Sequence, residues 1–325
     1  MKRIKQTRSA LIFSVLYLAI LFGWLNAAGQ NGQKFHYIDA KTPEGLREIF
    51  RYTGDRVPFL SAHRGGPEKH LPENHTVTFE NTLKHTWSVL EIDPRFTKDS
   101  VFIVHHDPTL WRTTTGEGRV ADFTWEELKG LKLKDMQGNI TEYKIQTLKE
   151  IMDWARGKTI LVLDQKEAPL GAYIDIVEEC MAESFAIIMA DSFEDVKTIY
   201  SRNKNIMMQV FIGSPDAVKE FEQTGVPWEN IVAFVSHQVP EDKSVFELIH
   251  QKGALCILGT SRNLDRELIR GNVSDIGELK DEYNALFGMG ADILETDIPV
   301  EVGKIVFDNV SIHPSKEKYF KISRK

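Results

Sequence analysis

The chain has 325 residues, of which 42% are apolar and 27% are charged, and its formal net charge is −7. This composition excludes a disordered chain and is typical of one large globular domain or two smaller ones. A net acidic protein is a poor ligand for nucleic acids and for anionic membranes, so neither partner is expected.

The N-terminal segment, residues 1–29, has the pattern of a signal peptide. Four basic residues and no acids precede the apolar stretch ALIFSVLYLAILFGWL, and small residues follow at Ala27, Ala28 and Gly29. An apolar segment of 16 residues is short for a membrane span, so we favour cleavage over retention as an anchor. The mature chain, residues 30–325, would have a formal charge of −11, would be periplasmic or secreted, and would have no stable membrane insertion.

The rest of the chain alternates short apolar runs with amphipathic stretches that have helical periodicity. The apolar runs are FLSAH (59–63), SVLEID (88–93), TILVLD (159–164), FAIIMA (185–190), IMMQVFI (206–212), IVAFVS (231–236), ALCILG (254–259) and ADILETD (291–297). Strands that are apolar throughout are typical of parallel sheets covered by helices. Eight such units in roughly 260 residues predict a single α/β domain, a (β/α)₈ TIM barrel.

One further extended run, SVFIVHH (100–106), does not fit into the barrel. Only TKDS separates it from IDPRF, and a parallel crossover needs about a dozen residues or more. The sequence therefore predicts an antiparallel hairpin after the second strand, which would bring His106 back to the mouth of the barrel.

The chain contains two cysteines, Cys180 on a predicted helix and Cys256 on a predicted strand. An exported protein permits a disulfide, but the two positions do not imply one. We expect two buried thiols.

Polar residues gather where the predicted barrel strands end, which is where catalytic residues of such barrels lie. They are His63 and Arg64 after the first strand, Glu91 and Asp93 on the second, Asp164 and Lys166 after the third, His237 after the sixth, and Glu295 and Asp297 on the eighth.

Glu91 and Asp93 are two residues apart on a strand and therefore point the same way. With Asp164 they would form three converging carboxylates, which a single hard divalent cation, Mg²⁺ or Ca²⁺, would stabilise. An ordinary salt-bridge network is a poorer account, because unpaired carboxylates on a buried strand are unfavourable.

Arg64 and Lys166 add positive charge that suits an anionic phosphate group. His63 and His106 would flank that phosphate, so that one histidine accepts a proton from the attacking hydroxyl and the other protonates the leaving alkoxide. Water and a neighbouring hydroxyl of the substrate are both open as the nucleophile.

Read in order, these segments resemble the successive motifs of the glycerophosphodiester phosphodiesterase family, within the PLC-like phosphodiesterase superfamily. The resemblance covers about residues 59–300 and rests on HRGG, PEN, EID followed by TKD, HHDPTLWRTTTGEGRV, DQK and GADILETDIP. It implies a metal-dependent hydrolase that cleaves glycerophosphodiesters, which are small molecules, to glycerol 3-phosphate and an alcohol.

The resemblance also implies roles for individual residues. His63 and His106 would be the acid/base pair, Arg64 and Lys166 would bind the phosphate, Glu91, Asp93 and Asp164 would hold the metal, and Glu73 would lie by the metal or support the two histidines. Asp164 stands where the family usually has Glu, and His75 stands where it usually has Thr.

Several residues and functions have alternative interpretations. Asp297 is equally well a cap of the following helix, Glu295 a packing residue and His237 a loop residue, while His105 is expected to be structural and RTTTGEG (112–118) a turn. Rival functions are a phospholipase of the same barrel type, which would need an exposed apolar rim, and a barrel that only binds phosphorylated ligands.

Overall fold

A computed structural model describes residues 33–240, 242–307 and 310–324 of the chain. The predicted signal peptide, residues 1–29, lies outside these ranges, and its cleavage stays a prediction. Phe35–Ile322 form one compact unit, and the few described residues beyond it belong to a second unit. Within the described ranges, no helix is both long enough and apolar enough to cross a bilayer.

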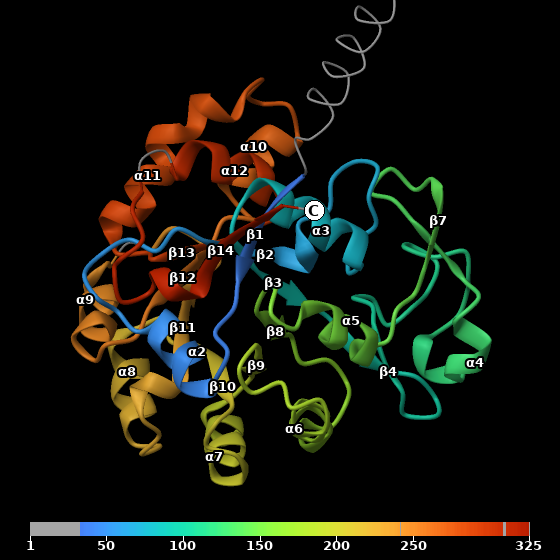
Figure 1. Ribbon diagram of the computed structural model, residues 1–325, viewed down its shortest axis with the longest axis horizontal. Helices are drawn as coiled ribbons and strands as arrows, with labels where there is room; N and C mark the ends of the chain where they lie inside the picture. Colours follow the sequence, from blue (N-terminus) through green and yellow to red (C-terminus); the bar gives the residue numbers. More distant parts are fainter. Residues whose placement is uncertain (1–32, 241, 308–309, 325) are drawn as a thin grey trace, which may run out of the picture. The chain divides into compact units, whose positions relative to one another are not determined.

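In the described part of the chain, eight parallel strands close into a barrel and follow one another around it in chain order (Figure 1). They are β2 (Leu60–Ala62), β3 (Ser88–Ile92), β8 (Leu161–Leu163), β9 (Ala186–Ala190), β10 (Met207–Phe211), β11 (Ile231–Ser236), β12 (Cys256–Gly259) and β13 (Ile293–Thr296). Each strand lies within one of the eight predicted apolar runs. The predicted (β/α)₈ barrel is therefore confirmed.

Helices alternate with the barrel strands and surround them (Figure 1). Several of them begin at a side-chain cap: the Ser192 hydroxyl accepts a hydrogen bond from the Asp195 amide, and the Ser214 hydroxyl accepts one from the Ala217 amide. The helices are α2 (Pro43–Phe50), α3 (Thr76–His85), α4 (Trp125–Leu128), α5 (Leu148–Ala155), α6 (Leu170–Glu179), α7 (Phe193–Arg202), α8 (Pro215–Glu222), α9 (Ser244–Gln251), α10 (Leu264–Ile269), α11 (Lys280–Met289) and α12 (Pro299–Val306).

The core has two layers because strand residues alternate between the two faces of the sheet. Leu161 and Leu163 on β8 pack with the helices, whereas Val162 between them packs with Val89 and other residues inside the barrel. Both layers are buried. The alternation also decides which side chains at the strand ends reach the barrel mouth.

Short two-stranded sheets accompany the barrel. The hairpin of β4 (Pro94–Phe96) and β5 (Phe102–Val104) is the predicted one. The hairpin of β6 (Lys132–Lys134) and β7 (Ile140–Lys144) and the pair of β1 (Lys34–Ile38) and β14 (Phe320–Arg324) were not predicted. These strands alternate between exposed and more buried residues, so they lack the continuous apolar runs that identify the barrel strands.

Cys180 and Cys256 are free and buried, as predicted. Burial raises the pKa of both thiols, so both stay protonated at neutral pH.

Candidate active site

The chain turns sharply after β2 through three residues in the left-handed region, Arg64 (φ 52°), Gly65 (φ 81°) and Gly66 (φ 76°). A Cβ on Gly65 would lie 2.2 Å from the Phe79 ring, and one on Gly66 would lie 2.2 Å from Pro299. Only glycine fits these two positions, which explains the HRGG motif. The turn places the Arg64 amide 2.7 Å from Oε2 of Glu91 on the next strand.

His63 is held by a carboxylate from the last barrel strand. Parallel pairing of β13 with β2 sets Thr296 beside Ala62, so the next residues, Asp297 and His63, are neighbours. Asp297 Oδ1 lies 2.6 Å from His63 Nδ1. The interpretation of Asp297 as a helix cap is wrong, because the N-cap of α12 is Ile298, which makes no capping bond.

The charge on His63 is set by competing effects. Burial alone would lower the pKa of the imidazole, but the bond to Asp297 and the nearby carboxylates of Glu91 and Glu295 outweigh it and raise the pKa to about 10. Glu295 is itself buried, and burial raises its pKa to about 7. His63 is therefore protonated at neutral pH in this environment, and Glu295 does more than pack.

The three predicted metal ligands converge. Glu91, Asp93 and Asp164 each offer an oxygen, and these oxygens lie within 4.8 Å of one another. Two oxygens bound to one cation are at most about 4.2 Å apart for Mg²⁺ and about 5.2 Å for Ca²⁺, so this spacing is compatible with a shared cation. All three donors are carboxylate oxygens, the type that these hard cations prefer.

Electrostatics at these carboxylates also favour a bound cation. Burial and repulsion from Asp93 raise the pKa of Glu91 well above its usual value. The pKa of Asp93 is lowered, because the charges of Lys166 and His106 outweigh the effect of its burial. The Lys166 ammonium lies 2.9 Å from Asp93 and also pairs with Asp164, so it partly neutralises the cluster.

Asn74 orients Asp93 and was not predicted as a site residue. Its Nδ2 donates to Asp93 Oδ2 at 2.6 Å, and its Oδ1 accepts from the Asp93 amide at 3.1 Å. Asn74 has a positive φ of 59°, which asparagine tolerates better than most residues. Asn74 belongs to the PEN motif, which the sequence does single out. The sequence does not show which carboxylate the Asn74 side chain would bind.

Glu73 is buried and receives two guanidinium groups. Arg112 donates to its two oxygens at 2.8 and 2.9 Å, and Arg64 donates at 3.2 Å. Both cations lower the pKa of Glu73 against the effect of burial. Glu73 thus orients Arg64, the predicted phosphate ligand.

His106 belongs to the same ion-pair network. Its Nδ1 lies 2.7 Å from Asp107 Oδ1, and Arg112 donates to Asp107 at 2.6 and 2.8 Å. Arg112 therefore bridges Glu73 and Asp107. The sequence pattern does not single it out, because it is the first residue of the RTTTGEG stretch, which has the composition of a turn.

Two other histidines were considered from the sequence, His105 as a structural residue and His237 as either a contact for the substrate's alcohol or a loop residue. His105 is buried with Nε2 3.1 Å from the Thr109 carbonyl, as expected for a structural residue. His237 packs 4.6 Å from the Phe234 ring, and among the described residues its buried Nδ1 has no hydrogen-bond partner.

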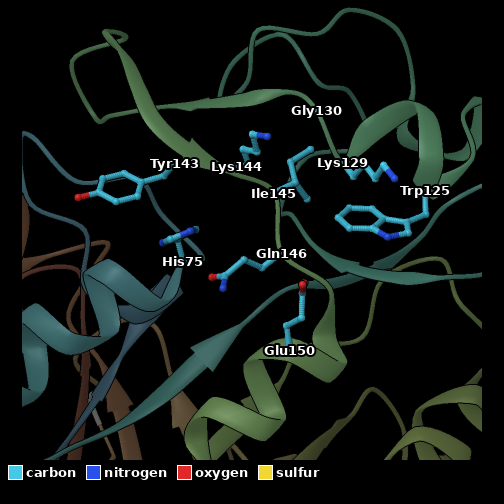
Figure 2. A pocket seen from close by; sticks show the side chains of 9 residues that line it. All are labelled: His75, Trp125, Lys129, Gly130, Tyr143, Lys144, Ile145, Gln146 and Glu150. Carbon is cyan, nitrogen blue, oxygen red and sulfur yellow. The ribbon is translucent and has the colours of Figure 1, made fainter.

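A pocket of about 560 Å³ lies apart from the predicted catalytic residues, none of which lines it (Figure 2). Its wall includes His75, Tyr143 on β7, Gln146 in the loop after β7, and Glu150 in the first turn of α5. His75 is the N-cap of α3, since its Nδ1 accepts a hydrogen bond from the Val77 amide at 3.0 Å. Burial lowers the pKa of His75 to about 4, so the ring stays neutral in the folded protein.

The neutral His75 predicts a loss of stability in acid. The unfolded chain binds a proton on this ring below about pH 6.5, whereas the folded chain does so only near pH 4. The free energy of unfolding should therefore fall by about 3 kcal/mol as the pH drops through this window. Urea titrations across the window should show a smaller fall for His75→Asn, which keeps a capping oxygen but does not titrate; an equal fall would refute the assignment.

Comparison with known proteins places the chain in a family. The model of the glycerophosphoryl diester phosphodiesterase family matches residues 63–266. The crystal structure of a glycerophosphoryl diester phosphodiesterase from Parabacteroides distasonis is similar over 88% of this chain and 99% of its own, with 37% sequence identity and a TM-score of 0.83. A phosphodiesterase of Oleispira antarctica, solved with the product sn-glycerol-3-phosphate, shares the fold at 17% identity, with a TM-score of 0.59 over 78% of this chain and 98% of its own.

Among curated sequences, the glycerophosphodiester phosphodiesterase of Caldanaerobacter subterraneus subsp. tengcongensis is 36% identical over 119 residues. That match covers 36% of this chain and 49% of the relative, so the chain spans about half the length of this relative. The family match includes both predicted catalytic histidines and all three predicted metal ligands. The chain therefore belongs to the glycerophosphoryl diester phosphodiesterase family.

Proposed function

We propose that this protein is a metal-dependent hydrolase that cleaves glycerophosphodiesters to glycerol 3-phosphate and an alcohol. The observation that carries the proposal is the convergence of three carboxylates with two histidines, each bonded through Nδ1 to an aspartate. The names of the relatives support it, as does the product bound to the Oleispira antarctica phosphodiesterase.

Arg64 and Lys166 would bind the phosphate group of the substrate. The Arg64 guanidinium is held by Glu73 through Nη1, and its Nε lies 3.9 Å from Asp93 Oδ2, so its positive charge lies beside the carboxylate cluster. Lys166 lies beside Asp93 and Asp164, so a phosphate bound by its ammonium group would lie next to the cation. A fork-shaped guanidinium and a point-charge ammonium are well suited to one phosphate.

Glu91, Asp93 and Asp164 would hold one divalent cation, Mg²⁺ or Ca²⁺. Such a cation supplies positive charge that stabilises the phosphoryl oxygens as the bond to the alcohol breaks. Asp164 is one methylene shorter than the glutamate expected from the family resemblance, and its oxygen nevertheless lies within the cluster.

The two histidines would divide the proton transfers. His63 is protonated at neutral pH because Asp297 and its other acidic neighbours raise its pKa, so it is suited to protonate the leaving alkoxide. His106, held at Nδ1 by Asp107, would use its other ring nitrogen to accept a proton from the attacking hydroxyl.

We also propose that residues 1–29 direct export and that residues 30–325 are the mature, periplasmic or secreted domain. The proposal rests on the basic and apolar pattern of the N-terminal residues. N-terminal sequencing of protein recovered from outside the cytoplasm tests it.

The activity is tested by incubating the purified protein with soluble glycerophosphocholine and Mg²⁺ or Ca²⁺ and measuring glycerol 3-phosphate. Release that stops on addition of EDTA and returns with the cation supports the proposal. Saturable binding of glycerophosphocholine without hydrolysis under either cation would instead support the rival function, a barrel that only binds phosphorylated ligands.

Arg112 is a positioning residue in this scheme, because it contacts Glu73 and Asp107 but none of the reacting groups. Arg112→Ala should lower kcat/KM by about 10- to 100-fold, since it frees the supports of both Arg64 and His106. The Glu73→Gln change should add little to it, because both substitutions break the same network. Fully additive losses in a double-mutant cycle would show that the two residues act separately.

A further inference from the structure

Three large apolar side chains are exposed on the segment between β3 and β8. Trp111 is 62% exposed, Met136 is 50% exposed and Ile140 is 62% exposed. Exposed residues of this size normally occur singly on a protein surface, so a cluster of them indicates a contact surface.

The three side chains are close neighbours. The Lys134 amide donates to the Thr113 carbonyl, and Thr114 bridges antiparallel to Leu133. Met136 lies in the turn between β6 and β7, two residues after Lys134. Ile140 is next to them, since it pairs with Lys134, whose ammonium donates to the Trp111 carbonyl at 2.6 Å. We call Trp111, Met136 and Ile140 the apolar patch.

The hairpin that carries the patch is anchored from its other face. Tyr143 on β7 lies 5.1 Å from the His75 ring, in the wall of the pocket in Figure 2. Ile145, directly after β7, is buried in a small apolar cluster. Alternation along β7 therefore directs Ile140 away from the body of the protein.

The surroundings of the patch are locally basic, although the chain as a whole is acidic. Lys132 and Lys144 are exposed on β6 and β7, and Lys134 lies between them and the patch. Glu142 is the exposed acid on β7, while Asp135 is buried and accepts hydrogen bonds within its own turn. With Glu117 and Arg119, which are exposed on the adjoining loop, the surroundings hold four cationic groups against two exposed carboxylates, a balance that complements an anionic surface.

The patch is also adjacent to the catalytic residues. Trp111 directly precedes Arg112, whose guanidinium bonds both Glu73 and Asp107 beside His106. The segment that carries Trp111 is therefore bonded directly to the residues that support the catalytic site. Tryptophan and aliphatic side chains with neighbouring lysines are the combination that inserts into the interface of a bilayer.

We propose that the apolar patch docks the protein on anionic lipid bilayers, and that phosphodiesters enter the catalytic site from that surface. The second clause rests on the proposed function; the first does not. Net charge alone argued against a membrane partner, whereas the local arrangement of lysines and apolar side chains favours one. It also supplies the exposed apolar rim that a phospholipase of this barrel type would need.

The test is cosedimentation of the purified protein with vesicles of phosphatidylcholine, with and without phosphatidylglycerol. We expect the wild type to bind more strongly to vesicles that contain phosphatidylglycerol. The Met136→Ser/Ile140→Ser variant should bind these vesicles about tenfold more weakly, which corresponds to a loss of about 1.4 kcal/mol of binding free energy. Ile322→Ser is the matched control, because Ile322 is 54% exposed on β14, away from the patch. Trp111→Ser is a second, independent variant should the double variant fail to fold.

Equal sedimentation of wild type and both patch variants, or no sedimentation of the wild type, would overturn the docking proposal. Self-association in gel filtration that is lost in the double variant, without vesicle binding, would overturn it too and assign the patch to a second copy of the chain. Hydrolysis of soluble glycerophosphoglycerol is measured in parallel. Vesicle binding without hydrolysis rejects the proposed function alone, and hydrolysis without vesicle binding rejects docking alone.

Discussion

Replacing His63 with alanine is expected to lower kcat for glycerophosphocholine by about a thousandfold. The reason is that choline leaves as an alkoxide, which needs a proton, and His63 is the protonated imidazole at the site. Circular dichroism should show an unchanged fold, since His63 is partly exposed and its main contact is with Asp297. The exposed His85→Ala variant is the matched control and should keep the wild-type rate.

The leaving group separates the two histidines. A glycerophosphodiester of p-nitrophenol releases a phenolate that needs no proton, so His63→Ala should lose little activity on it. His106→Ala should lose activity on both substrates, because its proposed role is to accept the proton of the nucleophile. Equal losses of both variants on both substrates would refute the division of roles.

Replacing Glu91 with glutamine should remove most of the metal affinity and most of the activity. The amide keeps the shape of the side chain but removes one of the three charges that converge on the site. We expect a loss of about a hundredfold or more in the affinity for Mg²⁺ or Ca²⁺, measured by isothermal titration calorimetry. The exposed Glu142→Gln on β7 is the control for a simple change of net charge.

Metal affinity should also depend on pH in a defined direction. Burial and Asp93 raise the pKa of Glu91, so the cation must displace a proton from it. The apparent affinity should therefore rise with pH, and proton release on binding should be measurable in buffers of different ionisation enthalpy. An affinity independent of pH, or unchanged by Glu91→Gln, would mean that Glu91 is not a ligand.

The barrel could be predicted from the sequence because its signals are local. Each barrel strand is an apolar run buried on both faces, and a connection as short as TKDS permits only an antiparallel return. The residues at the strand ends follow from the same rule, since such barrels gather them at one mouth. Glu91, Asp93 and Asp164 were therefore predictable as a group without knowledge of their distances.

The ion-pair partners of the histidines could not be predicted in the same way. Asp297 was ambiguous because its helix-capping interpretation is local, whereas its bond to His63 depends on closure of the barrel between the last strand and the first. Arg112 was missed because Glu73 is 39 residues away and no periodicity links them. Contacts of this kind depend on the register of strands and loops, which hydrophobic patterning does not encode.

The bridge formed by Arg112 links parts of the chain on either side of β3. Glu73 lies before that strand, whereas Arg112, Asp107 and His106 lie after it. A chimaera whose crossover falls in β3 would thus combine Glu73 from one parent with the loop that carries Arg112 from the other. Chimaeras of distant homologues should therefore fold more often than they retain catalytic activity. To keep the activity, residues 73–112 should have to come from the same parent.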